Sequence, residues 1–513
     1  MTTIIYIPLD ERPATLGFPQ ALLKSNSEIK LLVPPANFLG YKKKPAAVEE
    51  LWTWLETEAA QATHLLCSLD MLLYGGIVPS RLHSFTKEEC EAKLQRLVSL
   101  KQKHPKLAIY AFNLIMRVPA YSSSDEEPDY YADFGKEIFY WGWLQDKIGR
   151  GQGGDTEQTE LARIKEAIPE EVQRDYLGRR AVNHLVNTRA LSLAKDGVLD
   201  FLVIPLDDCA EYGFSAAEQR SLLEQVEKDT LQDQVYIYPG ADEVGSTLLC
   251  RIYNQLKGEK PRVFVRYSST IGPFIIPRYE DRPLGESIKS QITVCGGVLV
   301  DNSLEADLIL MVNSPTLNNG TMQEAAEAVS SKDTSYYSFR NLREFTESIA
   351  YYLSQGKKVA VADVAFGNGA DHEFMQILGK RGLLGKIYSY GAWNTPGITI
   401  GTVLAHALAK IGSQVTQDQV DHFTLDRYLE DWGYQVLVRT YLRENAEDLG
   451  ITYFDLKDQA AQISTTAQTM LQEFIERYLA EFKDTYRIEK VYFPWNRLFE
   501  IGFTTKIQDR EPF

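Results

Sequence analysis

Short apolar runs recur along the chain, and each is followed by polar or glycine-containing residues and then by a longer helical pattern. Continuous apolar strands that alternate with helices are typical of a parallel sheet buried on both faces. The pattern therefore predicts an α/β protein. The strand candidates are Ile4–Pro8, Lys30–Val33, His64–Leu69, Leu107–Ile115, Asp200–Leu206, Val235–Tyr238, Val263–Tyr267, Thr293–Val298, Asp307–Val312, Val359–Val364 and Ile387–Tyr390.

These candidates outnumber the strands of a single eightfold barrel. We therefore expect two open, Rossmann-like β/α halves followed by a helical C-terminal region, and a TIM-type barrel with additional domains is the alternative. A turn-rich break at Gly258–Pro261 marks the expected boundary between the halves. The predicted domains are residues 1–257, with a helical insertion at 116–199, then residues 258–412, then the helical region 413–513.

Charge and cysteine content narrow the class of partner. The 513 residues carry a formal charge of −16, which repels phosphate backbones and anionic lipids, so neither nucleic acid nor a membrane is expected as a partner. The five scattered cysteines include no CxxC pair, and the first residues lack the pattern of a signal peptide. We expect a cytoplasmic protein with a small-molecule carbohydrate substrate, and a homo-oligomer stays open.

The polar residues that follow the predicted strands are strongly acidic. In parallel β/α folds the carboxyl ends of the strands line the ligand crevice, so these residues are candidates for chemistry. They include the adjacent pairs Asp207-Asp208 and Asp242-Glu243. The residues predicted to bind substrate are Asp10, Glu11, Arg12, Asp70, Tyr74, Arg117, Tyr212, Asp371, Trp393 and Asn394.

The two carboxylate pairs are the predicted catalytic residues. A single Asp after a strand is most often a helix cap, but a helix start needs only one capping side chain. Two adjacent carboxylates repel each other unless both have partners. The arginines expected to balance this charge, or to hold an anionic or polar substrate, are Arg12, Arg81, Arg117 and Arg189.

Paired carboxylates suit glycoside hydrolysis. One group keeps a proton for the leaving oxygen, and the other is ionised and assists attack at the anomeric carbon. Flat aromatic side chains can then stack on sugar rings. The available aromatic residues are Trp141, Trp143, Tyr212, Trp393 and Trp495. The chain is thus predicted to be a glycoside hydrolase that needs no cofactor.

The segment Tyr238–Val244 resembles the strand-end motif of retaining β-N-acetylhexosaminidases, in which a glycine-rich turn precedes Asp-Glu-Val. This resemblance implies that Asp242 orients the substrate acetamide and that Glu243 is the general acid. The pair Asp207-Asp208 resembles the adjacent aspartates of the O-GlcNAcase-like enzymes. Both likenesses imply an N-acetylamino sugar in the substrate.

A wider resemblance rests on motifs spread over nearly the whole chain. They are Ile7–Pro13, Ser68–Gly76, Gly240–Glu243, Trp393–Thr395 and Phe493–Arg497. Together they resemble an uncharacterised bacterial family known by the domain-of-unknown-function label DUF4127. The resemblance implies one shared architecture and no particular activity.

Two other functions stay open. A divalent cation such as Mg²⁺ or Mn²⁺ would suit a hydrolase or isomerase of a small polar metabolite. Its ligands would come from Asp10, Asp208, Asp242, Glu243, Asp371 and His372. A non-catalytic sugar-binding protein would share the β/α halves. Nucleophilic hydrolases and dinucleotide enzymes are disfavoured, since neither GxSxG nor GxGxxG follows a strand.

Overall fold

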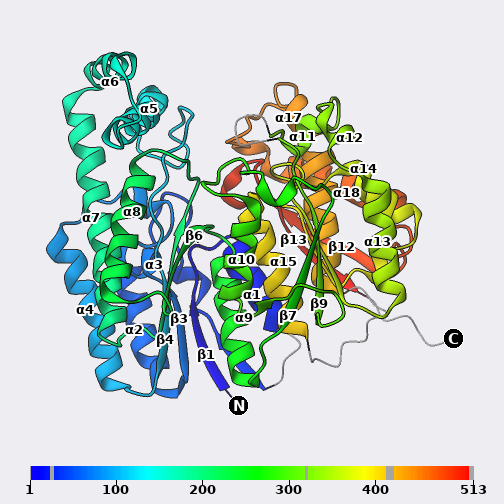
Figure 1. Ribbon diagram of the computed structural model, residues 1–513, viewed down its shortest axis with the longest axis horizontal. Helices are drawn as coiled ribbons and strands as arrows, with labels where there is room; N and C mark the ends of the chain where they lie inside the picture. Colours follow the sequence, from blue (N-terminus) through cyan, green and yellow to red (C-terminus); the bar gives the residue numbers. More distant parts are fainter. Residues whose placement is uncertain (1, 24–27, 318–321, 412–420, 508–513) are drawn as a thin grey trace. The chain divides into compact units, whose positions relative to one another are not determined.

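A computed structural model of the chain describes residues 2–23, 28–317, 322–411 and 421–507 (Figure 1). They form two compact units. The first unit comprises Met1–Leu248 with Tyr279–Asp281, and the second comprises Leu249–Arg278 with Arg282–Phe513. The division falls at Leu248, ahead of the predicted boundary after residue 257, and the described part of 413–513 belongs to the second unit.

The first unit is built on a six-stranded parallel sheet with the order β2-β1-β3-β4-β5-β6. Strand β5 is buried along its whole length, as a continuous apolar run requires in a sheet covered on both faces. The strands are β1 (Thr2–Ile7), β2 (Ile29–Leu32), β3 (His64–Ser68), β4 (Ala108–Phe112), β5 (Phe201–Leu206) and β6 (Val235–Pro239).

Helices connect these strands and cover the sheet. Helix α4 begins at a capping box in which Thr86 and Glu89 satisfy each other's backbone amides. The stretch predicted as a helical insertion contains α5, α6 and α7, and Figure 1 shows α5 and α6 at one end of the long α7. The helices are α1 (Phe18–Leu23), α2 (Val48–Glu58), α3 (Leu69–Tyr74), α4 (Lys87–Lys103), α5 (Tyr131–Gly149), α6 (Asp155–Ala167), α7 (Glu170–Lys195) and α8 (Phe214–Asp229); α9 (Val244–Lys257) begins in the first unit and continues into the second.

The second unit contains a five-stranded parallel sheet with the order β11-β10-β9-β7-β8. Its strands are β7 (Arg262–Tyr267), β8 (Val298–Leu299), β9 (Leu308–Asn313), β10 (Val359–Asp363) and β11 (Ser389–Gly391). Its helices are α10 (Leu284–Val294), α11 (Ala325–Ala328), α12 (Ser335–Ser338), α13 (Leu342–Ser354), α14 (His372–Lys380), α15 (Pro396–Lys410), α16 (His422–Arg427), α17 (Arg439–Glu444) and α18 (Ala460–Tyr478), with a π-helix at Tyr428–Val438.

Two details of the second unit differ from the prediction. The run Thr293–Val298 was expected to be a strand, but α10 continues to Val294 and β8 begins only at Val298. The C-terminal region was expected to be helical, but β12 (Tyr486–Tyr492) and β13 (Gly502–Ile507) form an antiparallel pair. Alternating buried and exposed residues in β12 are the period-2 pattern of a strand covered on one face.

The predicted α/β class is confirmed. Both main sheets are open in the described ranges, so the barrel alternative is not observed there. In each sheet the first strand lies between the second and the third, which creates a switch point between β1 and β3 and another between β7 and β9. Ligands of open α/β sheets bind at such points, beyond the carboxyl ends of the strands. Among the described helices, none has the length and apolar character that a bilayer crossing requires.

Candidate functional site

The carboxyl ends of β3, β4 and β5 bring two arginines and four carboxylates of the first unit together. We call this group the strand-end cluster; it consists of Arg81, Arg117, Glu126, Glu127, Asp207 and Asp208. The Arg81 guanidinium lies 2.6 Å from the Asp207 carboxylate, and that of Arg117 lies 3.1 Å from Asp208. Both arginines also contact both glutamates, at 2.8–3.3 Å. The sequence thus predicted Asp207, Asp208 and Arg117 in one site.

Charge within the strand-end cluster does not balance when every carboxyl group is ionised, because four carboxylates face two arginines. Burial and the neighbouring Asp207 carboxylate raise the pKa of Asp208 to about 6. Asp208 therefore holds a proton at a higher pH than an ordinary aspartate does, although Arg117 and Arg81 oppose the shift. The cluster contains a carboxylic acid poised near neutrality.

The backbone at Asp208 is strained. Its φ of 36° lies in the left-handed region, which costs a residue with a side chain about 1–3 kcal/mol. The next residue, Cys209, donates its N–H to the carbonyl of Tyr279, which has a φ of 71°. Asp207 and Asp208 are both half-buried, and the Oδ1 atom of each makes no hydrogen bond to a described residue. These oxygens keep acceptor capacity for a further hydrogen bond.

Asp70 lies in the first turn of α3, directly after β3. Its side chain is buried, and its Oδ2 accepts the N–H of Leu114 at 3.0 Å. Burial raises the pKa of Asp70 to about 7, and the charge of Asp207 contributes in the same direction. Tyr74, also predicted to bind substrate, is buried and stacks on the His83 ring at 4.4 Å. Its position indicates a packing role.

Asp10, Arg12 and Asp242 form a second, buried ion group in the first unit. The Arg12 Nη2 atom lies 2.7 Å from Asp10 and 2.6 Å from Asp242, and Thr15 donates its hydroxyl to Asp10. The side chains of Arg12, Asp10 and Asp242 are no more than 5% exposed. Arg12 and Asp242, which are 230 residues apart in the sequence, thus compensate each other's charge.

The Glu243 carboxylate folds back on its own strand end. Its Oε2 accepts the N–H of Ala241 at 2.9 Å, and the side chain is buried. A Cβ added at Gly240 would lie 2.1 Å from Oε1, so only glycine leaves room for this arrangement. The Gly-Ala-Asp-Glu motif therefore has a local structural reason that is independent of catalysis.

The remaining predicted residues of the first unit lie near its loops and insertion. Glu11 is half-buried and accepts the N–H of Lys42 at 3.2 Å. Tyr212 packs edge-on against Trp143 at 5.3 Å. Trp141 is buried in the core of the insertion, so it cannot stack on a sugar.

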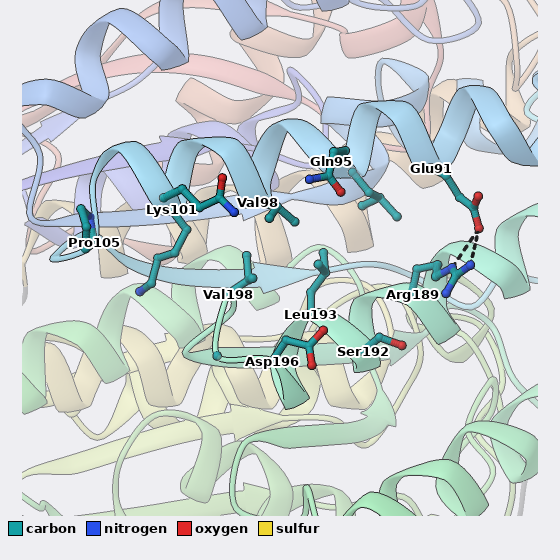
Figure 2. A pocket seen from close by; sticks show the side chains of 13 residues that line it. Glu91, Gln95, Val98, Lys101, Pro105, Arg189, Ser192, Leu193, Asp196 and Val198 are labelled. Carbon is teal, nitrogen blue, oxygen red and sulfur yellow. Dashed lines mark hydrogen bonds and ion pairs between the residues drawn. The ribbon is translucent and has the colours of Figure 1, made fainter.

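Arg189 does not join either ion group. It pairs with Glu91 at 2.7 Å, and both residues line a groove of about 680 Å³ between α4 and α7. Figure 2 shows the paired side chains. Both side chains are substantially exposed. The expectation that Arg189 would balance the strand-end carboxylates is therefore wrong.

In the second unit, the predicted residue Asp371 belongs to a buried ion network. Asp371 is fully buried and pairs with Arg340 at 2.7 Å and Lys332 at 2.9 Å. Burial opposes its ionisation, but these two cations offset burial and lower the pKa of Asp371. The neighbouring Asp363 accepts the N–H of Asp371, and burial followed by the Asp371 charge raises the pKa of Asp363 to about 7.

Trp393 and Asn394 follow β11. Trp393 is buried with its ring 5.9 Å from that of Phe499, and Asn394 has a φ of 72°. The Asn394 carbonyl accepts the N–H of Asn368, itself left-handed with a φ of 56°. These contacts fix the loop conformation after β11.

In the described ranges, the residues proposed to hold a divalent cation do not form a metal site. Within these ranges no three His, Cys, Asp or Glu side chains gather in a geometry that could hold a metal ion. His372 accepts the indole N–H of Trp432 at 2.9 Å, and Asp371 is already compensated by its two cations.

Glu126 and Glu127 are members of the strand-end cluster that sequence reasoning missed. They precede Pro128 in the stretch that leads into α5, far from any strand. No local pattern in the sequence points to them, because they follow no predicted strand.

These features define a parallel α/β protein with an arginine–carboxylate centre at the ends of its strands. The chain belongs to the family described as protein of unknown function DUF4127, whose model matches residues 4–504. No curated protein matches the sequence. The predicted membership of this family is confirmed.

Proposed function

We propose that the chain is a glycoside hydrolase that acts on a small glycoside containing an N-acetylamino sugar, with Asp208 as the general acid. The observation that carries this proposal is Asp208 itself. It combines a pKa of about 6, a strained backbone and an adjacent second carboxylate at a strand end. Strain and a raised carboxyl pKa are both typical of active sites.

The two aspartates have different roles in the proposed reaction. Arg81 holds one oxygen of Asp207, and the free Oδ1 accepts the N–H of the substrate acetamide. The acetamide oxygen then attacks the anomeric carbon while Asp208 gives its proton to the leaving oxygen. The glycosidic bond breaks with its electron pair on that oxygen, and Arg117 stabilises the ionised Asp208 that remains.

This assignment favours Asp207-Asp208 over Asp242-Glu243 for the chemical step. Asp242 is compensated by Arg12, and Glu243 accepts a backbone N–H from its own turn. The Oδ1 atoms of Asp207 and Asp208 have no such partners among the described residues. The likeness to the O-GlcNAcase-like aspartate pair supports the same choice.

We also propose that the protein acts in the cytoplasm and needs no metal or cofactor. All five cysteines are free and buried, which suits a reducing compartment. Turnover that resists a chelator would support the second point, and loss restored by Mg²⁺ or Mn²⁺ would contradict it.

The proposal is tested with aryl N-acetylglucosaminides that carry either a good leaving group, dinitrophenol, or a poor one, methoxyphenol. Asp208→Asn should lower kcat/KM for the poor leaving group by roughly 10²–10⁴-fold, because that group departs only when protonated. The good leaving group needs no proton, so its rate should change little. Glu243→Gln is the matched control and should leave both rates close to those of the unaltered protein.

Two results would contradict this assignment. Equal turnover by Asp208→Asn and the unaltered protein on both substrates would exclude Asp208 as the acid. A loss confined to Glu243→Gln would move the acid to Glu243. Absence of any turnover by the unaltered protein on these glycosides would remove the proposed substrate class.

A further inference from the structure

A groove of about 1110 Å³ lies in the second unit, beside the carboxyl end of β7. One wall is the loop Ser268–Thr270, which directly follows β7, and another is the segment Tyr336–Glu344, which runs from α12 into the first turn of α13. The groove therefore lies at the switch point between β7 and β9. This is the place where an open parallel sheet of this strand order binds its ligand.

Arginines line this groove, and part of their donor capacity is unused. Arg343 is exposed and makes no ion pair with a described residue. Arg340 is only 7% exposed; its Nη1 contacts Asp371 and Asn313, but its Nε has no hydrogen-bond partner in the described ranges. The Nε of Arg266 lacks a partner there as well. Both arginines thus keep donor capacity beside the groove.

The backbone adds further donors at the same wall. Helix α13 begins at Leu342, and its cap, Asn341, accepts the N–H of Glu344 through its side chain. The amides of the first turn and the helix dipole favour an anion there. Thr270 is exposed across the groove, and its hydroxyl has no partner among the described residues. Anion-binding groups thus come from two separate segments of the chain.

Two aromatic side chains lie on the groove wall with unusual exposure. Tyr337 is 66% exposed and Phe339 is 54% exposed, although both are large apolar residues. Flat rings in this position can stack on a base or on the apolar face of a sugar. The groove combines an anion-binding end with a surface for a ring.

We propose that this groove binds a phosphate monoester carried on a ring, that is, a mononucleotide or a sugar phosphate. Arg343, Thr270 and the first turn of α13 hold the phosphate. Tyr337 and Phe339 contact the ring. This inference is independent of the hydrolytic reaction proposed for the first unit, because it involves none of the residues of the strand-end cluster.

Isothermal titration calorimetry on the full chain tests the proposal. The probes are adenosine monophosphate, glucose phosphate, adenosine and inorganic phosphate. We expect one of the two monoesters to bind more tightly than adenosine and more tightly than inorganic phosphate. Preference for the nucleotide identifies base stacking, and preference for glucose phosphate identifies a sugar. Arg343→Ala should weaken this binding about tenfold, as loss of one charge-assisted hydrogen bond predicts.

Arg443→Ala is the matched control, because Arg443 is also an exposed arginine of a helix in the second unit and lies outside the groove. It should bind as the unaltered protein does. Tyr337→Ala should weaken binding of the monoester and leave that of inorganic phosphate unchanged. The proposal is overturned if neither monoester binds more tightly than adenosine and inorganic phosphate, if Arg343→Ala leaves the affinity of the preferred monoester unchanged, or if no probe binds.

Discussion

Asp208 shows how one residue can gather several signs of function. Burial is the largest cause of the raised pKa of Asp208, and repulsion from the neighbouring Asp207 carboxylate raises it further. The Arg117 guanidinium limits the shift. The φ of Asp208, 36°, carries a steric penalty that would be smaller for Gly or Asn. A purely structural position would not be expected to retain both a strained backbone and a proton-holding carboxyl group.

The pH dependence of turnover follows from this residue. A general acid works only when protonated, so kcat/KM should be highest below the pKa of Asp208 and should fall as the pH rises through about 6. Replacing Arg117 by Met should move this fall to higher pH, because the guanidinium favours the ionised carboxylate. Initial rates from about pH 4 to pH 8 measure both profiles. A rate that rises through this range would assign Asp208 the opposite role.

At the scale of elements, the helical insertion depends on close packing between α5 and α8. The Trp141 ring meets Phe214 edge-on at 5.1 Å. Next to it, a Cβ added at Gly142 would lie 2.5 Å from the Phe214 ring. Glycine is retained inside this helix because the neighbouring ring occupies the space of a side chain.

A pair of glycine substitutions tests this packing. Gly142→Ala should destabilise the protein by roughly 1–3 kcal/mol, since overpacking outweighs the higher helix propensity of alanine. Gly178 in α7 has open space around its Cα, so Gly178→Ala should stabilise it by about 0.5–1 kcal/mol. Urea denaturation followed by circular dichroism measures both. Equal effects of the two changes would show that Phe214 yields its place without strain.

The strength of local patterns decided which elements could be predicted. Helix α18 lies in the region predicted to be helical, because apolar residues recur at three-to-four spacing over its whole length. The strand expected at Thr293–Val298 failed, since two residues of β8 carry almost no periodic signal. The hairpin of β12 and β13 was missed because its pairing joins segments on either side of the Phe493–Arg497 motif.

At the scale of the whole molecule, buried carboxyl groups that keep their protons should make stability depend on pH. Burial raises the pKa of Asp70 to about 7, that of Asp363 to about 7 and that of Glu430 to about 8. In the unfolded chain these groups ionise near pH 4. Between pH 4 and these values the folded state binds more protons, so the free energy of unfolding falls as the pH rises.

We therefore expect the urea midpoint to fall between about pH 7.5 and pH 8.5, above most of the range in which unfolded histidines titrate. The Asp70→Asn variant has no ionisable group at position 70. Its urea midpoint should therefore exceed that of the unaltered protein, and the difference should grow toward pH 8. Asp129→Asn, at an exposed position, serves as the control and should follow the unaltered protein. A midpoint that rises with pH over this interval would contradict the raised pKa of Asp70.

Both main sheets have the same relative strand order, although the sequence shows no internal repeat. Alternating apolar strands and helices constrain each half to a parallel sheet, and such a sheet has few favourable connections. Similar topology therefore arose without similar side chains. This recurrence places a switch point in each unit.

The sequence by itself determined the α/β class, the positions of most strands and the acidic character of the strand ends, because these follow from local periodicity and composition. Only the tertiary structure decided which charges meet. It joined Arg12 to Asp242 across 230 residues and brought Glu126 and Glu127 to Arg81 and Arg117. Ionisation depends on burial and on distances of a few ångströms, and chain folding alone fixes those.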